Sequence, residues 1–217
     1  MFQKILIANR GEIAVRIIRA CREMGIKTVA VYSEADRDAL HTLLADEAIC
    51  IGPAPSTESY LDMERILTAC VVMKADAIHP GFGFLSENAR FAELCEKCNI
   101  RFIGPSAEII NKMGNKSEAR KTMMAAGVPV VPGSKEPVYT VEEGLKTAKE
   151  VGFPVMIKAS SGGGGKGMRV SRSEEDFESN FLNAQMESVK GFSDNTMYIE
   201  RFVENPRHIE FQILGDR

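Results

Sequence analysis

Short apolar runs alternate with longer amphipathic stretches over residues 4–103 of this 217-residue chain. Residues 4–8 (KILIA) have the pattern of a buried strand, and four apolar residues then recur at helical spacing: Ala14, Ile17, Ile18 and Cys21. Strands that alternate with helices of this length form parallel sheets with right-handed crossovers. The pattern therefore predicts a Rossmann-like, doubly wound α/β domain, with further strands at residues 27–32, 48–51, 77–79 and 101–103 and helices at 61–73 and 87–98.

A run of glycines between two strand-like segments is the second informative feature. Residues 160–169 (SSGGGGKGMR) hold five glycines and two cations; an apolar run ending at Lys158 precedes them, and a strand is expected at 168–171. Bare backbone N–H groups beside lysines suit the oxygens of a polyphosphate. Ordering consecutive glycines costs entropy, which a tip without a ligand would not recover. We therefore expect a phosphate-binding hairpin rather than a passive flexible tip.

The second half of the chain reads as a smaller α+β module. Residues 128–133 are proline-rich and mark a domain junction, and Thr140 and Glu143 have the spacing of a capping box that starts a helix. A helix from 173 to 188 follows the hairpin, with strands at 196–200 and 208–214. A strand so close to the last residue lacks a later partner, which suggests a fragment. The expected divisions are residues 1–114, a linker helix at 115–130, the module at 131–203, and the start of a further domain at 204–217.

Composition narrows the class of protein. The chain is 44% hydrophobic and 26% charged with a net charge of −3, which is typical of a soluble protein and gives no sign of nucleic-acid binding. No apolar run is long enough for a membrane span and no signal peptide is visible, so we expect a cytoplasmic protein. Five cysteines suit reduced thiols, and Cys95 and Cys98 alone are too few ligands for a structural metal.

The glycine run at 160–169 fits three familiar glycine-loop motifs poorly. A dinucleotide fingerprint would need a helix after Gly167, where a strand is expected, and a P-loop would need Ser or Thr after Lys166. A protein kinase would place valine where Arg169 stands and its phosphate lysine after the loop, whereas Lys158 precedes it. Two strand-end segments, 9–12 and 79–87, still belong at the ligand edge of the first sheet. There His79 is by default a packed residue, and Glu87 by default caps the next helix.

The arrangement of strand, Lys158, glycine loop, strand, helix and the segment 198–203 (YIERFV) resembles the ATP-grasp enzymes, and the flanking blocks resemble the biotin carboxylase family. The blocks run along the whole chain at similar spacing. They are residues 4–16 (KILIANRGEIAVR), 79–88 (HPGFGFLSEN), 102–106 (FIGPS), 114–116 (GNK) and 204–210 (ENPRHIE). Residues 35–41, 44–48 and 51–56 look most like the biotin carboxylase subunit of bacterial acetyl-CoA carboxylase. Pyruvate and propionyl-CoA carboxylases share the core blocks and remain alternatives.

The resemblance implies a ligase in which ATP activates bicarbonate and the carboxyl group passes to biotin on a carrier protein, the first half-reaction of acetyl-CoA carboxylase in fatty acid synthesis. It implies a biotin carboxyl carrier protein and carboxyltransferase subunits as partners, and a homodimer. The module at 131–203 would be the ATP-grasp lid, preceded by the pre-ATP-grasp domain. Another ATP-grasp carboxylate–amine ligase, or a regulatory nucleotide-binding module without chemistry, are rival interpretations.

The resemblance also assigns roles to residues. Lys116 and Lys158 would reach the phosphates, while Glu200 and backbone groups of Arg201 and Val203 would meet adenine and His208 the ribose. Without the resemblance, Glu200 would be an exposed strand-end carboxylate and His208 a structural residue. The loop residues assigned to ATP are Gly163, Gly164, Gly165, Lys166, Gly167 and Met168.

The biotin pocket would include Phe82, Gly83 and Glu87, and Phe82 departs from the family, which usually shows tyrosine. The lost hydroxyl removes one potential hydrogen bond, about 0.5–1.5 kcal/mol net, so function is expected to survive. The residues that would bind Mg²⁺ and bicarbonate, and the arginine that would contact biotin, lie beyond residue 217. We assign no catalytic or metal-binding residue within the chain, and we expect it to show no turnover and only weak nucleotide binding by itself.

Overall fold

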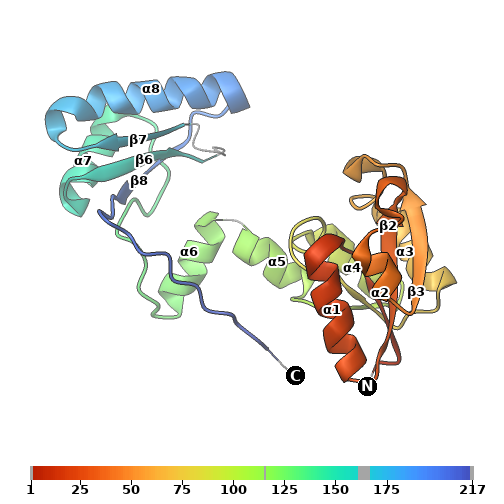
Figure 1. The fold of residues 1–217 in the computed structure, drawn as a ribbon. Coiled ribbons are helices and arrows are strands. Elements are labelled where there is room, and N and C mark those ends of the chain that lie inside the picture. The colour runs from red at the N-terminus through yellow and green to blue at the C-terminus, as the bar shows by residue number, and fades with distance from the viewer. Residues whose placement is uncertain (1, 115, 161–166, 216–217) are drawn as a thin grey trace. The chain divides into compact units, whose positions relative to one another are not determined.

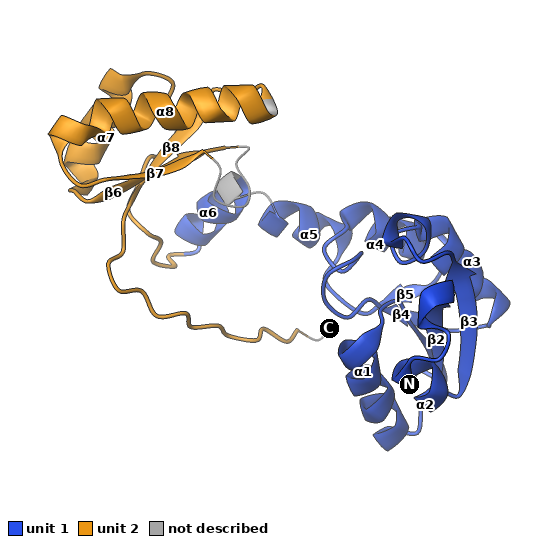
Figure 2. Cartoon of the chain, turned by 45° about the horizontal axis from the view of Figure 1, so that its top comes forward, with its two compact units in different colours: residues 1–126 blue, residues 127–217 orange. Residues whose placement is uncertain are grey.

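The computed structural model describes residues 2–114, 116–160 and 167–215 and divides the chain into two compact units, residues 1–126 and 127–217 (Figure 2). Each unit has its own hydrophobic core. The expected boundaries at residues 114, 130 and 203 stay predictions.

Unit 1 is built on a parallel sheet of five strands in the order β3-β2-β1-β4-β5. Figure 1 shows its strands β2 and β3 side by side. The strand order reverses direction beside β1, because β2 and β3 lie to one side of it and β4 and β5 to the other. The doubly wound fold expected from the alternating pattern is therefore confirmed. The strands are β1 (Lys4–Ile7), β2 (Lys27–Ser33), β3 (Glu47–Gly52), β4 (Ala77–His79) and β5 (Arg101–Phe102).

Helices cover both faces of this sheet. The apolar stripe of α1 (Gly11–Glu23) packs with Ile5, Ile7 and Ala77 in one core cluster. Residues of α3 (Met63–Val72) and α4 (Ala89–Lys97) pack with Leu6 and Val29 in the other. Successive side chains of a strand point to opposite faces, which is why neighbouring residues of β1 enter different clusters.

The start of α4 corrects one expectation. Glu87 was the expected cap of this helix, but the Asn88 side chain is the group that accepts the Phe91 N–H, at 2.9 Å. Asparagine and aspartate are strong caps because their short side chains reach the free N–H groups of the first turn, and Asp62 does the same for α3. Glu87 is exposed beside this cap.

Short helices that the sequence pattern did not predict lie after β2 and β3. They are η1 (Glu34–Asp36), α2 (Leu40–Leu44) and η2 (Ser56–Glu58). Unit 1 ends with α5 (Ala107–Gly114) and α6 (Lys116–Ala125), and α6 falls where the linker helix at 115–130 was expected. The five cysteines are free thiols; Cys21, Cys70 and Cys95 are buried. Within the described residues, no helix combines the length and apolarity that crossing a membrane requires.

Unit 2 is the expected small α+β module. Its antiparallel sheet has the order β7-β6-β8, formed by β6 (Val155–Ala159), β7 (Met168–Ser171) and β8 (Met197–Arg201). The helices α7 (Val141–Val151) and α8 (Glu174–Phe192) bury one face of that sheet around Phe177 and Phe181. The capping box at Thr140 and Glu143 is present, as predicted, and α8 begins with a second one.

The expected strand at residues 208–214 is wrong. Residues 202–215 run outside any strand, and Ile209, Phe211 and Ile213 are exposed. The alternation of apolar and polar residues is that of a strand, but a strand also needs a neighbour for its backbone N–H and C=O groups. No neighbouring strand pairs with this segment in the described part of the chain.

Candidate functional site

The candidate site is the face of the unit 2 sheet that the helices leave uncovered. Along β6, Val155, Ile157 and Ala159 are buried under the helices, while Met156 and Lys158 point the other way and are half-buried. Cross-strand partners share a face of a sheet. The pairing of β6 with β7 and β8 therefore gathers six half-buried side chains on this open face: Met156, Lys158, Met168, Val170, Tyr198 and Glu200.

One ion pair stands among these largely apolar side chains. Lys158 Nζ donates to Glu200 Oε2, and the two side chains are 37% and 28% exposed. In the register, Lys158 lies opposite Tyr198 and Glu200 opposite Met156, so the pair crosses the sheet diagonally. An apolar surface with a cation and a carboxylate can hold a ligand that combines a flat ring bearing hydrogen-bond donors with an anionic tail.

The root of the glycine loop lies beside this face. Gly167 has a φ of +69°, and a Cβ on it would lie 2.7 Å from the Cβ of Ala159. The Ala159 N–H donates to the Gly167 carbonyl at 2.8 Å, and the Gly167 N–H donates to Glu187 Oε2 at 2.9 Å. Gly163, Gly164, Gly165 and Lys166, which the resemblance assigned to ATP, lie outside the described residues.

The other described residues assigned to ATP lie outside the six side chains of the open face. Arg201 ends β8, and its backbone N–H already donates to the Pro132 carbonyl at 2.8 Å. Val203 and His208 follow in the extended segment and are exposed. Lys116 begins α6, in unit 1. The structure thus brings together Lys158, Met168 and Glu200. Sequence reasoning missed Met156, Val170 and Tyr198, although the period-two alternation of β6, β7 and β8 held the signal.

The second predicted ligand region, at the carboxyl ends of β1 and β4, is also assembled. The buried Asn9 amide donates to the carbonyls of both Pro80 and Phe82, each at 2.8 Å. Gly81 has a φ of +65°, and a Cβ there would lie 2.7 Å from Asn9 Nδ2. Beyond this clamp Phe82 is 68% exposed, and Gly83 and Glu87 are also exposed. The strand ends do meet at one edge, as their parallel pairing requires.

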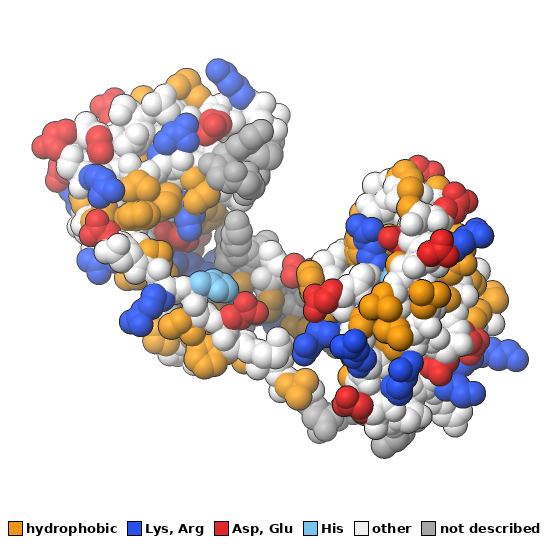
Figure 3. Space-filling model, in the orientation of Figure 1, with side chains coloured by type: hydrophobic (Ala, Val, Ile, Leu, Met, Phe, Trp, Pro, Cys, Tyr) orange, Lys and Arg blue, Asp and Glu red, His pale blue; other side chains and the backbone are white. Residues whose placement is uncertain are grey.

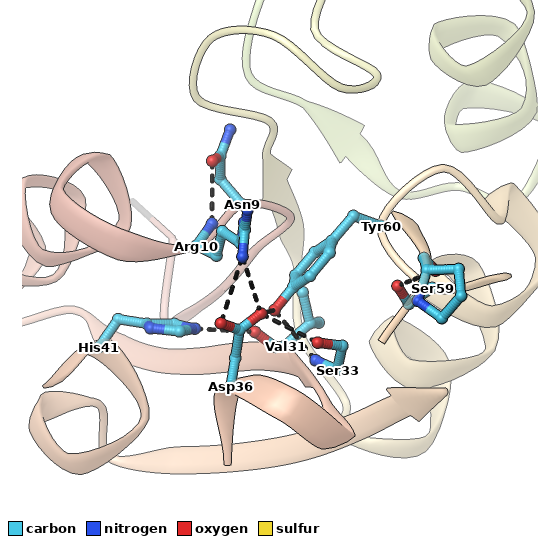
Figure 4. A network of polar contacts seen from close by, with 9 residues as sticks. Asn9, Arg10, Val31, Ser33, Asp36, His41, Ser59 and Tyr60 are labelled. Atoms are coloured by element: carbon cyan, nitrogen blue, oxygen red, sulfur yellow. Dashed lines mark hydrogen bonds and ion pairs between the residues drawn. The ribbon is translucent and has the colours of Figure 1, made fainter. Parts of the chain in front are cut away.

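A polar network supports this edge (Figure 4). The Asp36 carboxylate accepts the Tyr60 hydroxyl at 2.6 Å and the Ser33 hydroxyl at 2.9 Å, and the Arg10 guanidinium lies 3.3 Å away. Burial alone would raise the pKa of Asp36, but these hydrogen bonds and the Arg10 charge hold it below its usual value. Tyr60 in turn stacks on Phe84, with ring centroids 5.0 Å apart. The network thereby holds the loop that carries Phe82.

Two histidines of unit 1 lie near the same edge. His41 is fully buried; its Nε2 lies 3.2 Å from the Val31 carbonyl, and its Nδ1 has no hydrogen-bond partner among the described residues. His79 Nδ1 accepts the Gly81 N–H at 3.1 Å. Burial lowers the pKa of both imidazoles, because it disfavours the charged form. His79 is half-buried at the end of β4, where its Nδ1 stabilises the turn at Gly81.

A metal site is not formed by the residues that the structure describes. Within them, no three side chains among His, Cys, Asp and Glu gather closely enough to hold an ion. Glu200, the carboxylate on the open face, is already engaged by Lys158. Mg²⁺ prefers several oxygen ligands in octahedral geometry, so one engaged carboxylate does not make a site for it.

Known protein families match both the N-terminal and the C-terminal part of the chain. Residues 1–110 match the family model described as biotin carboxylase, N-terminal domain, and residues 115–217 match the ATP-binding domain of the carbamoyl-phosphate synthase L chain. Biotin carboxylase 1 of Bacillus subtilis (strain 168) is 57% identical over 216 residues, which are 100% of this chain and 48% of the relative. A biotin carboxylase of Nostoc sp. is 60% identical over 99% of this chain and 48% of its own length.

Solved structures give the same result. A biotin carboxylase from Campylobacter jejuni in a β-γ-ATP complex is 53% identical with a TM-score of 0.83, over 95% of this chain and 46% of that one. The biotin carboxylase domain of a thermophilic 2-oxoglutarate carboxylase, bound to bicarbonate, is 48% identical with a TM-score of 0.86, over 94% and 44% of the two chains. The chain spans about half the length of the relatives it matches, and it belongs to the biotin carboxylase family.

Proposed function

We propose that the open face of the unit 2 sheet binds ATP. The observation that carries the proposal is the joint placement of Lys158, Glu200 and Met168 on one half-buried face beside the root of the glycine loop. Lys158 would leave Glu200 and bind phosphate oxygens, because a half-exposed ion pair contributes little and a polyphosphate carries several negative charges. Glu200 would then accept the adenine amino group, with Met168 and Met156 against the ring.

The proposed reaction follows from the family. In the complete enzyme, a bicarbonate oxygen would attack the γ-phosphorus of ATP and release ADP, and the carboxyl group would pass to a ureido nitrogen of biotin on a carrier protein with loss of phosphate. This chain would supply part of the ATP site, with Lys116, Arg201, Val203 and His208 as further contacts. Mg²⁺ would be held by residues beyond this chain. Phe82, Gly83 and Glu87 would contribute to the biotin pocket.

We further propose the acetyl-CoA carboxylase branch, with a biotin carboxyl carrier protein and carboxyltransferase subunits as partners and a homodimeric assembly. The segments 35–41, 44–48 and 51–56 support this branch. The solved biotin carboxylase domain of 2-oxoglutarate carboxylase, with the higher of the two TM-scores above, supports a keto-acid carboxylase as the alternative. The domain limits proposed above, with the lid at residues 131–203, belong to the same proposal.

The test is ADP release by a full-length protein that carries this sequence. Release that requires both bicarbonate and biotin is the expected result. Release driven by another carboxylic acid, in the absence of biotin, would favour a different ATP-grasp ligase. Acetyl-CoA carboxylation by the assembled subunits, compared with pyruvate and 2-oxoglutarate as acceptors, separates the branches.

A further inference from the structure

Glu187 ties the root of the glycine loop to α8 from the side of the sheet opposite the open face. Its Oε2 accepts the Gly167 N–H at 2.9 Å and lies 3.2 Å from Arg169 NH1. Arg169 pairs with Ile157 in the register and therefore points to the face that the helices cover. One carboxylate oxygen thus holds two points on the chain just after the loop.

The backbone at Gly167 leaves little freedom once this contact is made. Its left-handed φ of +69° and its close approach to Ala159 both favour glycine. Its carbonyl accepts the Ala159 N–H, and on the other edge of β6 the Ser160 N–H donates to the Thr196 carbonyl at 2.9 Å. Both ends of the loop are therefore hydrogen-bonded into the unit 2 fold at Ser160 and Gly167.

The position of Gly167 determines which side chains of β7 lie on the open face. The next residue, Met168, lies opposite Lys158 in the register of β6 and β7. A slip of one residue would turn Met168 away from the face and bring Arg169 onto it, since alternate residues point to opposite sides. The contact between Glu187 and Gly167 opposes that slip at the end of the hairpin where no further β7 residue pairs.

We propose that Glu187 is a positioning residue for nucleotide binding at the open face, acting through Gly167 and the hairpin register. The proposal rests on the function proposed above. Arg169 offsets the negative charge of Glu187, so the clamp adds little net repulsion toward a polyphosphate on the other side of the sheet. Glu187 acts through its contacts with Gly167 and Arg169, which lie beside the six side chains of the open face, so it is a positioning residue and not a catalytic one.

The test compares Glu187→Ala, Glu187→Gln and wild type in the 217-residue chain. Glu187→Ala removes the acceptor, so amide hydrogen exchange at Gly167, followed by NMR without ligand, should become faster. Its dissociation constant for ATP, measured by calorimetry, should rise about tenfold, the equivalent of one charge-assisted hydrogen bond. Glu187→Gln keeps a side-chain carbonyl that can accept the same N–H, and should stay within about threefold of wild type.

Glu178→Ala is the matched control, because Glu178 is an exposed glutamate on the same helix. It should leave both the Gly167 exchange rate and the ATP affinity unchanged. Unchanged Gly167 exchange in Glu187→Ala would overturn the clamp, and unchanged affinity despite faster exchange would overturn its role in binding. Absence of ATP binding by wild type would instead overturn the proposed function, so the two failures are distinguishable.

Discussion

The two loops assigned to ligands are held in different ways. The unit 1 loop at residues 79–87 is clamped by a buried amide, Asn9, and by the stacking of Phe84 on Tyr60. The root of the unit 2 loop is held by Glu187, whose side chain is 38% exposed. Breaking a buried hydrogen bond leaves an unsatisfied group, whereas a half-exposed carboxylate can exchange its partner for water. The comparison teaches that the unit 1 loop is held by a buried contact, while the root of the unit 2 loop at Gly167 is held by a contact that water can replace at modest cost.

The substitution with the largest expected effect removes the Asn9 hydrogen bonds that clamp the unit 1 loop. Asn9→Leu should lower the free energy of unfolding of unit 1 by about 2–4 kcal/mol, since two carbonyls lose their donor in a buried place. Urea unfolding measures this change. The same substitution at Asn183, exposed on α8, is the control and should cost under about 0.5 kcal/mol. Equal costs at both positions would show that the Asn9 contacts contribute nothing special.

The second prediction separates two glycines of the same loop. Gly81 and Gly83 both have left-handed φ, but only at Gly81 would a Cβ meet the Asn9 amide. Gly83→Ala should cost about 1 kcal/mol from backbone strain, and Gly81→Ala about 1–2 kcal/mol more because the clamp must shift. Thermal unfolding of the two variants measures the difference. Indistinguishable melting temperatures would contradict the close approach.

Local patterns in the sequence predicted much of the fold. The apolar runs and helical stripes located the parallel sheet, and the Thr140 capping box and the glycine run located α7 and the hairpin. The prediction of a strand at 208–214 was wrong, because alternating apolar and polar residues indicate a preference for strand pairing and not the presence of a partner strand. Glu187 had no local signal, because its contact with Gly167 spans 20 residues and depends on how α8 packs on the sheet.

The candidate site likewise combines residues that local motifs predicted with contacts that only the tertiary fold creates. The family blocks named Lys158, Met168 and Glu200 as ligands, and the strand register joins them on one face. The Asp36 and Tyr60 network was not expected, because its partners come from separate segments that only the tertiary fold brings together. Motifs identify the chemistry of single residues, while support from neighbouring elements requires the structure.

As the pH falls, the free energy of unfolding of unit 1 should decrease before that of unit 2. Burial lowers the pKa of His41 in the folded state from its usual 6.5, so the unfolded chain takes up a proton first as the pH falls. The free energy of unfolding of unit 1 should therefore decline below about pH 6.5, well above the range where Asp36 protonates. Urea unfolding at pH 7.5 and 5.5 measures this, and His41→Gln should show a smaller decline. If His41→Gln showed the same decline as wild type, a group other than His41 would be its cause.

The smallest expected effect concerns the stability of unit 2. Lys158→Gln should change its free energy of unfolding by under about 1 kcal/mol, because a half-exposed ion pair contributes little. Hydrogen exchange of the β6 amides measures the stability of this sheet directly. A loss of several kcal/mol would mean that the pair is structural and not held in readiness for a ligand.

The most direct test of the central claim is the dissociation constant of ATP for wild type and for Lys158→Gln, measured by calorimetry on the 217-residue chain. The account predicts weak binding by wild type and binding at least about tenfold weaker in the variant, with the folded state intact, because a charge-assisted contact to phosphate is lost. Equal affinity in the two proteins would remove Lys158 from the site and contradict the assignment of the open face as the nucleotide surface.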